Sequence, residues 1–247
     1  MARSFNYNQQ QYLQGSTPVS VTPFSVACWF YSDEAAHQTL LSISDGGNNT
    51  FYVRFRSNGA LRAYANGELA ETSSTFSLNE WHHALAVFAS STSRAIYGDG
   101  GSKGTDTDPV TPSGINIVRI GRAAGGEYFS GGLAEVGVWN VALTDVEVAF
   151  LATGVSPLSV RSGNLVGYWP LLGPTATGDN DFSTQNRFHL TAYNSPTWTT
   201  HPPNVKDALM WPWRDGVTSW MNPFWGEEAA GRIPRYGFTN FQIPGIV

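Results

Sequence analysis

Hydrophobic and polar residues alternate in short runs over about the first 140 residues, with turn-forming residues roughly every eight to twelve positions. The clearest run is 51–56, where Phe, Val and Phe alternate with Tyr, Arg and Arg, so one face of a strand is apolar and the other polar. Asn58-Gly59 follows, and this pair favours a type I′ turn because both residues tolerate a positive φ. The chain then returns over 61–65 and turns again at Asn66-Gly67. This pattern predicts antiparallel hairpins.

Further strands are expected at 24–31, 83–89, 94–97, 115–120 and 133–139. Short strands at regular spacing are typical of two packed antiparallel sheets, and the sequence shows no alternation of strands with helices. We therefore predict an all-β fold, a two-sheet antiparallel jelly-roll sandwich with one short helix and an irregular C-terminal arm.

The helix is expected over 144–153. Thr144 and Glu147 match the spacing of a capping box, and Gly154 is placed to end the helix with a positive φ. With this helix, the sandwich is assigned to residues 1–203.

Residues 204–247 are rich in Trp, Pro and Gly, and both strand alternation and helical periodicity fail there. A segment of this size rarely builds a core of its own. One hypothesis is an arm that wraps its own domain. Another is an arm that docks on a neighbouring subunit, because Trp dominates interface hot spots. A membrane-surface segment is a third alternative, although charged residues interrupt any apolar face. The candidate partner-binding residues are Trp211, Trp213, Trp220 and Trp225.

Composition narrows the function classes. The 247-residue chain has 13% charged residues, about half of the roughly 25% typical of soluble domains, and a net charge of −5. It contains no run of Lys or Arg, so nucleic-acid binding through counterion release is not expected. Its 13% aromatic content excludes a disordered chain. The sequence shows no secretory signal and no membrane span, so we expect synthesis in a cytoplasm and no membrane partner. The one cysteine, Cys28, lies in an apolar run and is expected to be buried.

Five segments carry a family resemblance: Phe24-Ser-Val-Ala-Cys-Trp-Phe30, Trp81-His-His-Ala-Leu-Ala-Val87, 120–139, 143–151, and Leu165-Val-Gly-Tyr-Trp-Pro-Leu171 with 179–190 behind it. In this order, over residues 5–200, they resemble laminin-G-like domains of the concanavalin A-like lectin/glucanase class. The resemblance implies the jelly-roll sandwich. It does not imply one function, because this fold carries lectins, glycanases, adhesion modules and virion proteins.

The resemblance also tells where catalytic acids would lie. Glycanases of this fold carry Glu-x-Asp-x-x-Glu on one strand, and hydrolysis needs two carboxyls about 5–9 Å apart. This chain offers only Glu135 there, in Leu133-Ala-Glu-Val-Gly-Val. We therefore expect no enzymatic activity and no catalytic residue. His82 and His83 adjoin on a strand and are expected to point to opposite faces, so they do not chelate a metal as neighbours.

No cofactor is expected, with calcium as the one alternative that the resemblance implies. Loop carboxylates and carbonyls would bind it, and the candidate ligands are Asp99, Asp106 and Asp108, or Asp45 in Asp45-Gly-Gly-Asn-Asn49. The same residues are also ordinary turn formers.

A sugar site needs an exposed aromatic ring beside polar groups. Tyr97, before the loop 98–104, and Tyr128, after Gly125-Gly126-Glu127, are the candidate carbohydrate-binding residues.

Two functional hypotheses follow. The first is a non-enzymatic virion structural protein, a capsid decoration (cement) or tail/fibre-associated protein of a bacteriophage. Its aromatic arm would anchor it to neighbouring capsid or tail subunits or to copies of itself. The second is a lectin module that recognises cell-surface glycans, with calcium dependence left open. The charge-poor surface and the tryptophan-rich arm favour the first hypothesis, with the virion as the location.

Overall fold

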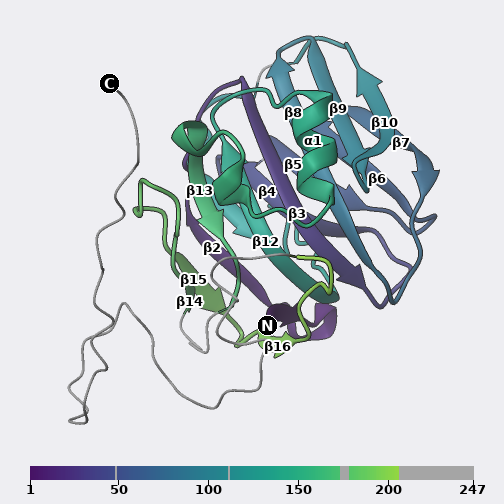
Figure 1. Ribbon diagram of the computed structural model, residues 1–247, viewed down its shortest axis with the longest axis vertical. Helices are drawn as coiled ribbons and strands as arrows, with labels where there is room; N and C mark the ends of the chain where they lie inside the picture. The colour runs from purple at the N-terminus through teal and green to yellow at the C-terminus, as the bar shows by residue number, and fades with distance from the viewer. Residues whose placement is uncertain (48, 111, 173–177, 206–247) are drawn as a thin grey trace, which may run out of the picture. The chain divides into compact units, whose positions relative to one another are not determined.

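The computed structural model describes residues 1–47, 49–110, 112–172 and 178–205, and they form two antiparallel sheets of eight strands each (Figure 1). Sheet A has the order β10 (Gly101–Asp106), β9 (Ser93–Gly98), β8 (Trp81–Ser90), β3 (Phe24–Ser32), β12 (Gly131–Trp139), β1 (Ala2–Phe5) and β16 (Thr197–Thr199), with β13 (Leu165–Trp169) also paired to β12. Sheet B has the order β14 (Gly178–Asp179), β15 (Leu190–Tyr193), β2 (Tyr12–Ser16), β11 (Ile117–Ile120), β4 (Gln38–Ser44), β5 (Thr50–Phe55), β6 (Ala60–Ala65) and β7 (Glu68–Thr75). The predicted all-β sandwich and its expected strands are confirmed.

The main core lies between the two sheets. Phe51 on β5 meets Phe24 on β3 and Phe88 on β8, with ring centroids 4.9 Å apart in both contacts. The alternation along β5 explains this placement, since Phe51, Val53 and Phe55 all belong to the main core. The pattern of apolar positions therefore sets which face of each strand is buried.

A helix closes the outer face of sheet A. This helix, α1 (Asp145–Ala152), lies against sheet A (Figure 1). It buries Val148 and Leu151 in a second apolar cluster with Leu85 of β8 and Trp139 of β12. No helix in the described part of the chain is long and apolar enough to cross a membrane. Residues 1–205, apart from the gaps given above, also contain three short 3-10 helices: η1 (Tyr7–Gln9), η2 (Pro157–Ser159) and η3 (Ser162–Asn164).

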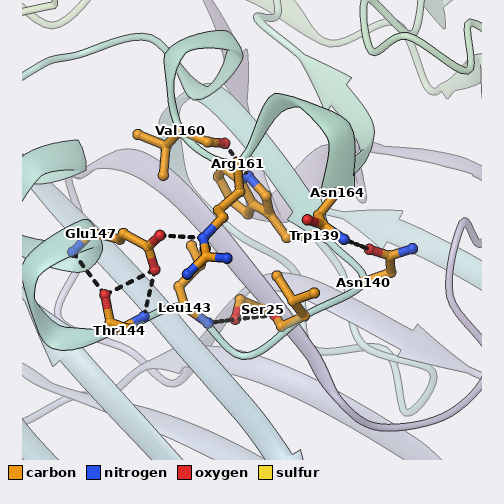
Figure 2. A network of polar contacts seen from close by, with 10 residues as sticks. Ser25, Trp139, Asn140, Leu143, Thr144, Glu147, Val160, Arg161 and Asn164 are labelled. Carbon is orange, nitrogen blue, oxygen red and sulfur yellow. Dashed lines mark hydrogen bonds and ion pairs between the residues drawn. The ribbon is translucent and has the colours of Figure 1, made fainter.

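The start of α1 is fixed by a capping box, as predicted. Figure 2 shows the Thr144 hydroxyl accepting a hydrogen bond from the Glu147 N–H at 3.4 Å, and the Glu147 carboxylate accepting one from the Thr144 N–H at 2.8 Å. Glu147 also forms an ion pair with Arg161. The indole of Trp139 donates to the carbonyl of Val160 at 2.8 Å. These contacts hold α1 and the turns that follow it against sheet A.

Two of the three predicted turns are confirmed and one is corrected. Gly154 follows α1 with a φ of 88°, and the pair Asn66 and Gly67 takes φ values of 45° and 110°. At Asn58-Gly59 the expected type I′ turn is wrong, because only Gly59 has a positive φ, of 84°. One glycine in the left-handed region is enough to close this hairpin.

The packing of the sandwich continues past residue 203, where the sequence places the domain boundary. Val205 is buried in a small cluster with Ala2, Trp29 and Ala134 on the outer face of sheet A. The candidate partner-binding tryptophans lie outside the described residues: Trp211, Trp213, Trp220 and Trp225.

Candidate functional site

The outer face of sheet B carries polar and aromatic side chains in one continuous cross-strand row. From β15 through β2, β11, β4 and β5 to β6, the paired positions are Thr191, Gln14, Arg119, Ser42, Tyr52 and Tyr64. Their chain neighbours Leu13 and Val118 point the other way, into the main core. The two outer faces of the sandwich therefore differ, since α1 covers an apolar face on sheet A whereas this one is polar and aromatic.

Four tyrosines gather at the β15 and β2 side of this face. Tyr12 on β2 and Tyr193 on β15 stack in parallel, with ring centroids 4.5 Å apart and 4° between the planes. The ring centroid of Tyr128 lies 6.2 Å from that of Tyr12, and 6.3 Å from that of Tyr7 in an edge-to-face contact. Tyr7 is 42% exposed and Tyr193 37% exposed, so aromatic surface is open to solvent.

Two arginines stand among these rings. The guanidinium carbon of Arg122 lies 4.7 Å from the ring centre of Tyr12 and 5.2 Å from that of Tyr128, a cation–π arrangement with both. Arg119 on β11 donates from Nε to the side-chain oxygen of Gln14 at 2.7 Å. Burial, and after it the charge of Arg122, lowers the pKa of Arg119. We name these six side chains the tyrosine–arginine patch: Tyr7, Tyr12, Arg119, Arg122, Tyr128 and Tyr193.

A short hairpin holds two members of the patch on the face. Arg122 and Tyr128 are opposite each other in an antiparallel bridge. The carbonyl of Arg122 accepts a hydrogen bond from the Ser42 hydroxyl at 2.7 Å, and Glu127 forms an ion pair with Arg54. Side chains of β4 and β5 thus hold the hairpin against the outer face of sheet B.

Of the two tyrosines proposed from the sequence for sugar binding, the structure places only Tyr128 in the patch. Tyr97 on β9 is 4% exposed, its hydroxyl donates to Asp145 at 2.7 Å, and Lys103 Nζ lies 5.2 Å from its ring centre. The prediction is wrong for Tyr97, because the docking of α1 on sheet A leaves no ring face for a sugar.

Sequence reasoning missed the remaining members of the patch. Arg119 interrupts the apolar positions of β11 and so carried a local signal of an outward-facing charge. Tyr12 and Tyr193 carried no such signal, since their significance depends on the pairing of β2 with β15, which come from opposite ends of the described chain.

The three aspartates predicted as calcium ligands do not form one site. Asp99 lies in the turn between β9 and β10, where its carboxylate contacts His82 Nδ1 at 2.8 Å and accepts a hydrogen bond from the His83 N–H at 2.7 Å. Asp106 is at the other end of β10. Five residues of extended strand separate Asp106 from the start of β10, which corresponds to about 16 Å. The expectation of a joint site is therefore wrong.

Asp106 and Asp108 are instead joined by Glu68 of β7, with carboxylate oxygens within 4.8 Å of one another. Arg94 forms an ion pair with Asp106 and donates to the carbonyl of Asp108 at 2.5 Å, so a guanidinium already counters these acids. Calcium takes six to eight oxygen ligands, and here it would have to displace this pair. The cluster does not fit calcium. The alternative, Asp45, is hydrogen-bonded within its own loop as in an ordinary turn.

His82 and His83 point to opposite faces of sheet A, as predicted. The ring of His82 packs against that of Phe30 in the main core, with centroids 5.7 Å apart. The ring of His83 packs edge-to-face against that of Trp29 on the outer face, with centroids 5.4 Å apart. Burial lowers the pKa of His83 to about 4. The pair cannot share a metal ion.

Glu135, the acid on the strand where glycanases carry three, is buried inside the protein. Its carboxylate accepts a hydrogen bond from the Tyr168 hydroxyl at 2.5 Å and contacts His201 Nε2 at 3.1 Å. A carboxylate that is 2% exposed and held on both oxygens is not placed to act on a glycosidic bond. This geometry supports a structural role.

The family assignment comes from a sequence comparison. The model of a family described as the concanavalin A-like lectin/glucanases superfamily matches residues 6–149, more than half of the chain. The chain belongs to this superfamily. No curated protein sequence matches it.

Solved structures resemble parts of this chain. One is a protein from Bacteroides ovatus ATCC 8483 with a suspected role in carbohydrate binding. Its TM-score is 0.54 at 20% identity, and the match covers 81% of this chain and 61% of the length of that protein. A heptameric SAP-like pentraxin from Limulus polyphemus has a TM-score of 0.45 at 20% identity, covering 57% of this chain and 75% of the pentraxin. The carbohydrate-binding module of the Ruminococcus gnavus IT-sialidase, bound to α2,3-sialyllactose, has a TM-score of 0.46 at 14% identity, covering 54% and 84%. At 20% identity, the Bacteroides ovatus structure shows the fold alone.

Proposed function

We propose that this protein binds carbohydrate without hydrolysing it, and that the tyrosine–arginine patch is its binding surface. The observation that carries the proposal is the stacked pair Tyr12 and Tyr193, whose partly exposed rings lie beside the guanidinium of Arg122.

This combination suits a sugar chemically. One side of a pyranose ring presents C–H groups that pack on an aromatic face, while its hydroxyls need hydrogen-bond partners in the same plane. Tyrosine supplies rigid contact area at a low entropy cost, and arginine supplies several N–H donors. A few well-placed polar groups beside an apolar surface are the usual makeup of a ligand site.

Membership of a lectin/glucanase superfamily, and the suspected carbohydrate binding of the Bacteroides ovatus protein, support the same proposal. The absence of hydrolysis is inferred from the acids near the face and on β12. Glu127 is ion-paired with Arg54, and Glu135 is buried and bonded on both oxygens.

The virion role expected from the sequence stays a prediction. It depends on tryptophans that lie outside the described residues, and no comparison bears on it. Carbohydrate binding rests on side chains that the structure describes, and is therefore preferred.

The test is binding of the full chain to an array of neutral and acidic glycans, followed by calorimetric titration of the strongest ligand. We expect Tyr12→Ala and Tyr193→Ala each to weaken binding about tenfold or more, because each removes one ring of the stacked pair.

Tyr31→Ala is the matched control. Tyr31 lies on β3 of sheet A, away from the patch, and we expect its variant to bind like the parent protein. The proposal fails if no glycan binds, or if the patch variants bind as tightly as the control while keeping the parent melting temperature.

A further inference from the structure

Most of the arginines that the structure describes are paired with acids. Nine lie in the described residues, and six of them form ion pairs with carboxylates: Arg3, Arg54, Arg56, Arg62, Arg94 and Arg161. The other three have no carboxylate partner in the described part of the chain. Arg187 is exposed in a loop, whereas Arg119 and Arg122 are in the tyrosine–arginine patch.

Among the described residues, the two patch arginines contact uncharged side chains. Arg119 donates to Gln14 at 2.7 Å and to the Ser44 hydroxyl at 3.1 Å, and the charged or ionisable groups that act on it are Arg122 and tyrosines. Arg122 contacts two rings, and its buried Nε has no hydrogen-bond partner among the described residues. Two like charges therefore belong to one patch, and neither forms an ion pair with a carboxylate of the described residues, in a protein of net charge −5.

Two guanidiniums in one partly buried patch destabilise each other, and a bound anion would relieve this repulsion. Two guanidiniums near one another repel, and burial removes part of the water that would screen them. A planar carboxylate or a sulfate accepts two parallel N–H bonds from a guanidinium, and these charge-assisted bonds are about twice as strong as neutral ones.

We infer that the glycan bound at the patch is acidic, with a carboxylate or sulfate group that Arg122 binds and Arg119 supports, while Tyr12 and Tyr193 pack against the sugar ring. This inference rests on the carbohydrate-binding function proposed above. It assigns the substrate class, an anionic saccharide, and it assigns Arg122 as the residue that selects it.

The experiment titrates the full chain with two matched pairs of polymers. Polygalacturonate and its fully methyl-esterified form differ in that the second carries an uncharged methyl ester in place of each carboxylate, and dextran sulfate and dextran differ in the sulfate. The variants are Arg122→Gln, which removes the charge, and Arg122→Lys, which keeps the charge without the planar fork. Arg187→Gln is the control, because it changes the net charge equally at an exposed site outside the patch.

We expect the charged member of at least one pair to bind and its neutral partner to bind at least about tenfold more weakly. Arg122→Gln should lose about tenfold or more of this affinity, Arg122→Lys should lose less, and Arg187→Gln should bind like the parent protein. The pair that responds tells whether carboxylate or sulfate is preferred. Added salt should weaken the binding of the charged polymer and leave the binding of neutral sugars unchanged.

Equal binding of charged and neutral polymers, unchanged in Arg122→Gln, would overturn the inference while leaving carbohydrate binding in place. Equal losses in Arg122→Gln and Arg187→Gln would also overturn it, since net charge would then explain the effect. Failure to bind any glycan, neutral or acidic, would refute the proposed function itself. Melting temperatures of all variants separate loss of a contact from loss of the fold.

Discussion

The rings of Tyr12 and Tyr193 stack 4.5 Å apart because their backbones are directly opposite in the pairing of β2 with β15. Strand β15 follows β1 to β14 and α1 in the chain, so it joins sheet B as one of its last strands. The returning segment is fastened to sheet A by the buried ion pair between Arg3 and Asp179. The aromatic surface of the patch thus depends on a late part of the chain docking correctly.

The hydroxyl and the ring of Tyr193 can be separated by substitution. Tyr193→Phe keeps the stacked ring and removes only the hydroxyl, so we expect it to retain most of the glycan affinity that Tyr193→Ala loses. Calorimetric titration of the two variants with one ligand measures the difference. Equal losses would mean that the hydroxyl, and not the ring face, makes the contact.

Glu135 is predicted to be a stability residue. Glu135→Ala leaves the hydroxyl of Tyr168 and the imidazole of His201 without their buried acceptor, and we expect a loss of about 3 kcal/mol in the free energy of unfolding. Glu135→Gln should cost less, because an amide oxygen still accepts from Tyr168. Urea unfolding measures both. Glu80→Ala, at an exposed acid, is the control and should change stability by less than about 0.5 kcal/mol.

His83 makes stability depend on pH. Its pKa is about 4 in the folded protein because of burial, against 6.5 for an ordinary imidazole. Between these two pKa values, His83 is therefore protonated in the unfolded chain and neutral in the folded protein. The stability contribution is complete above about pH 6.5 and is lost as the pH falls toward 4. We expect the free energy of unfolding to drop by about 2 to 3 kcal/mol from about pH 7.5 to about pH 4.5.

His83→Leu should flatten that pH dependence, whereas His37→Leu, at an exposed histidine, should leave it unchanged. Asp99 acts in a lower window. Burial raises the pKa of Asp99, but hydrogen bonds from His82 and His83 outweigh burial and lower it overall. Its contribution is therefore lost only below the ordinary pKa of an aspartate. A slope that persists in His83→Leu would assign the titration to another group.

Cys28 is buried in the main core, as the sequence predicts, and burial raises its pKa to about 12. Thiol reagents attack the thiolate, so we expect no labelling of the native protein at mildly alkaline pH and complete labelling in urea. Mass spectrometry after timed exposure gives the rate. Rapid labelling without denaturant would show that β3 opens readily.

The capping box of α1 contributes a defined amount of stability. Thr144→Ala removes the hydroxyl that accepts from the Glu147 N–H, and we expect a loss of about 1 kcal/mol, while Thr144→Ser should be close to neutral. Thermal unfolding of the two variants provides the comparison. Similar melting of both would mean that packing of α1 on sheet A outweighs its cap.

Local patterns were enough to predict the strands, the helix start and the burial of Cys28, because each depends on residues close in the chain. The alternation of β5 and the Thr144 to Glu147 spacing are examples. The Asn58-Gly59 turn shows the limit, since a dipeptide that tolerates two positive φ values uses only one here.

The site depended on contacts that no local pattern contains. Tyr97 ends an expected strand just before a loop in sequence, yet Asp145 at the start of α1 and Lys103 cover it. Asp106 meets Glu68 through the packing of β10 near β7, whereas Asp99, its apparent partner in sequence, is at the opposite end of the strand. Tertiary pairing therefore decided which candidates became neighbours.

The alternation of β2 has a practical use. Leu13 faces the main core, while Tyr12 and Gln14 face outward on the same strand, so the positions that hold the fold and those that meet a ligand are interleaved but distinct. A display library that randomises the outward residues of β2 and β15 and keeps the inward ones would vary recognition on a constant scaffold. The sandwich thereby offers a starting point for engineered glycan reagents.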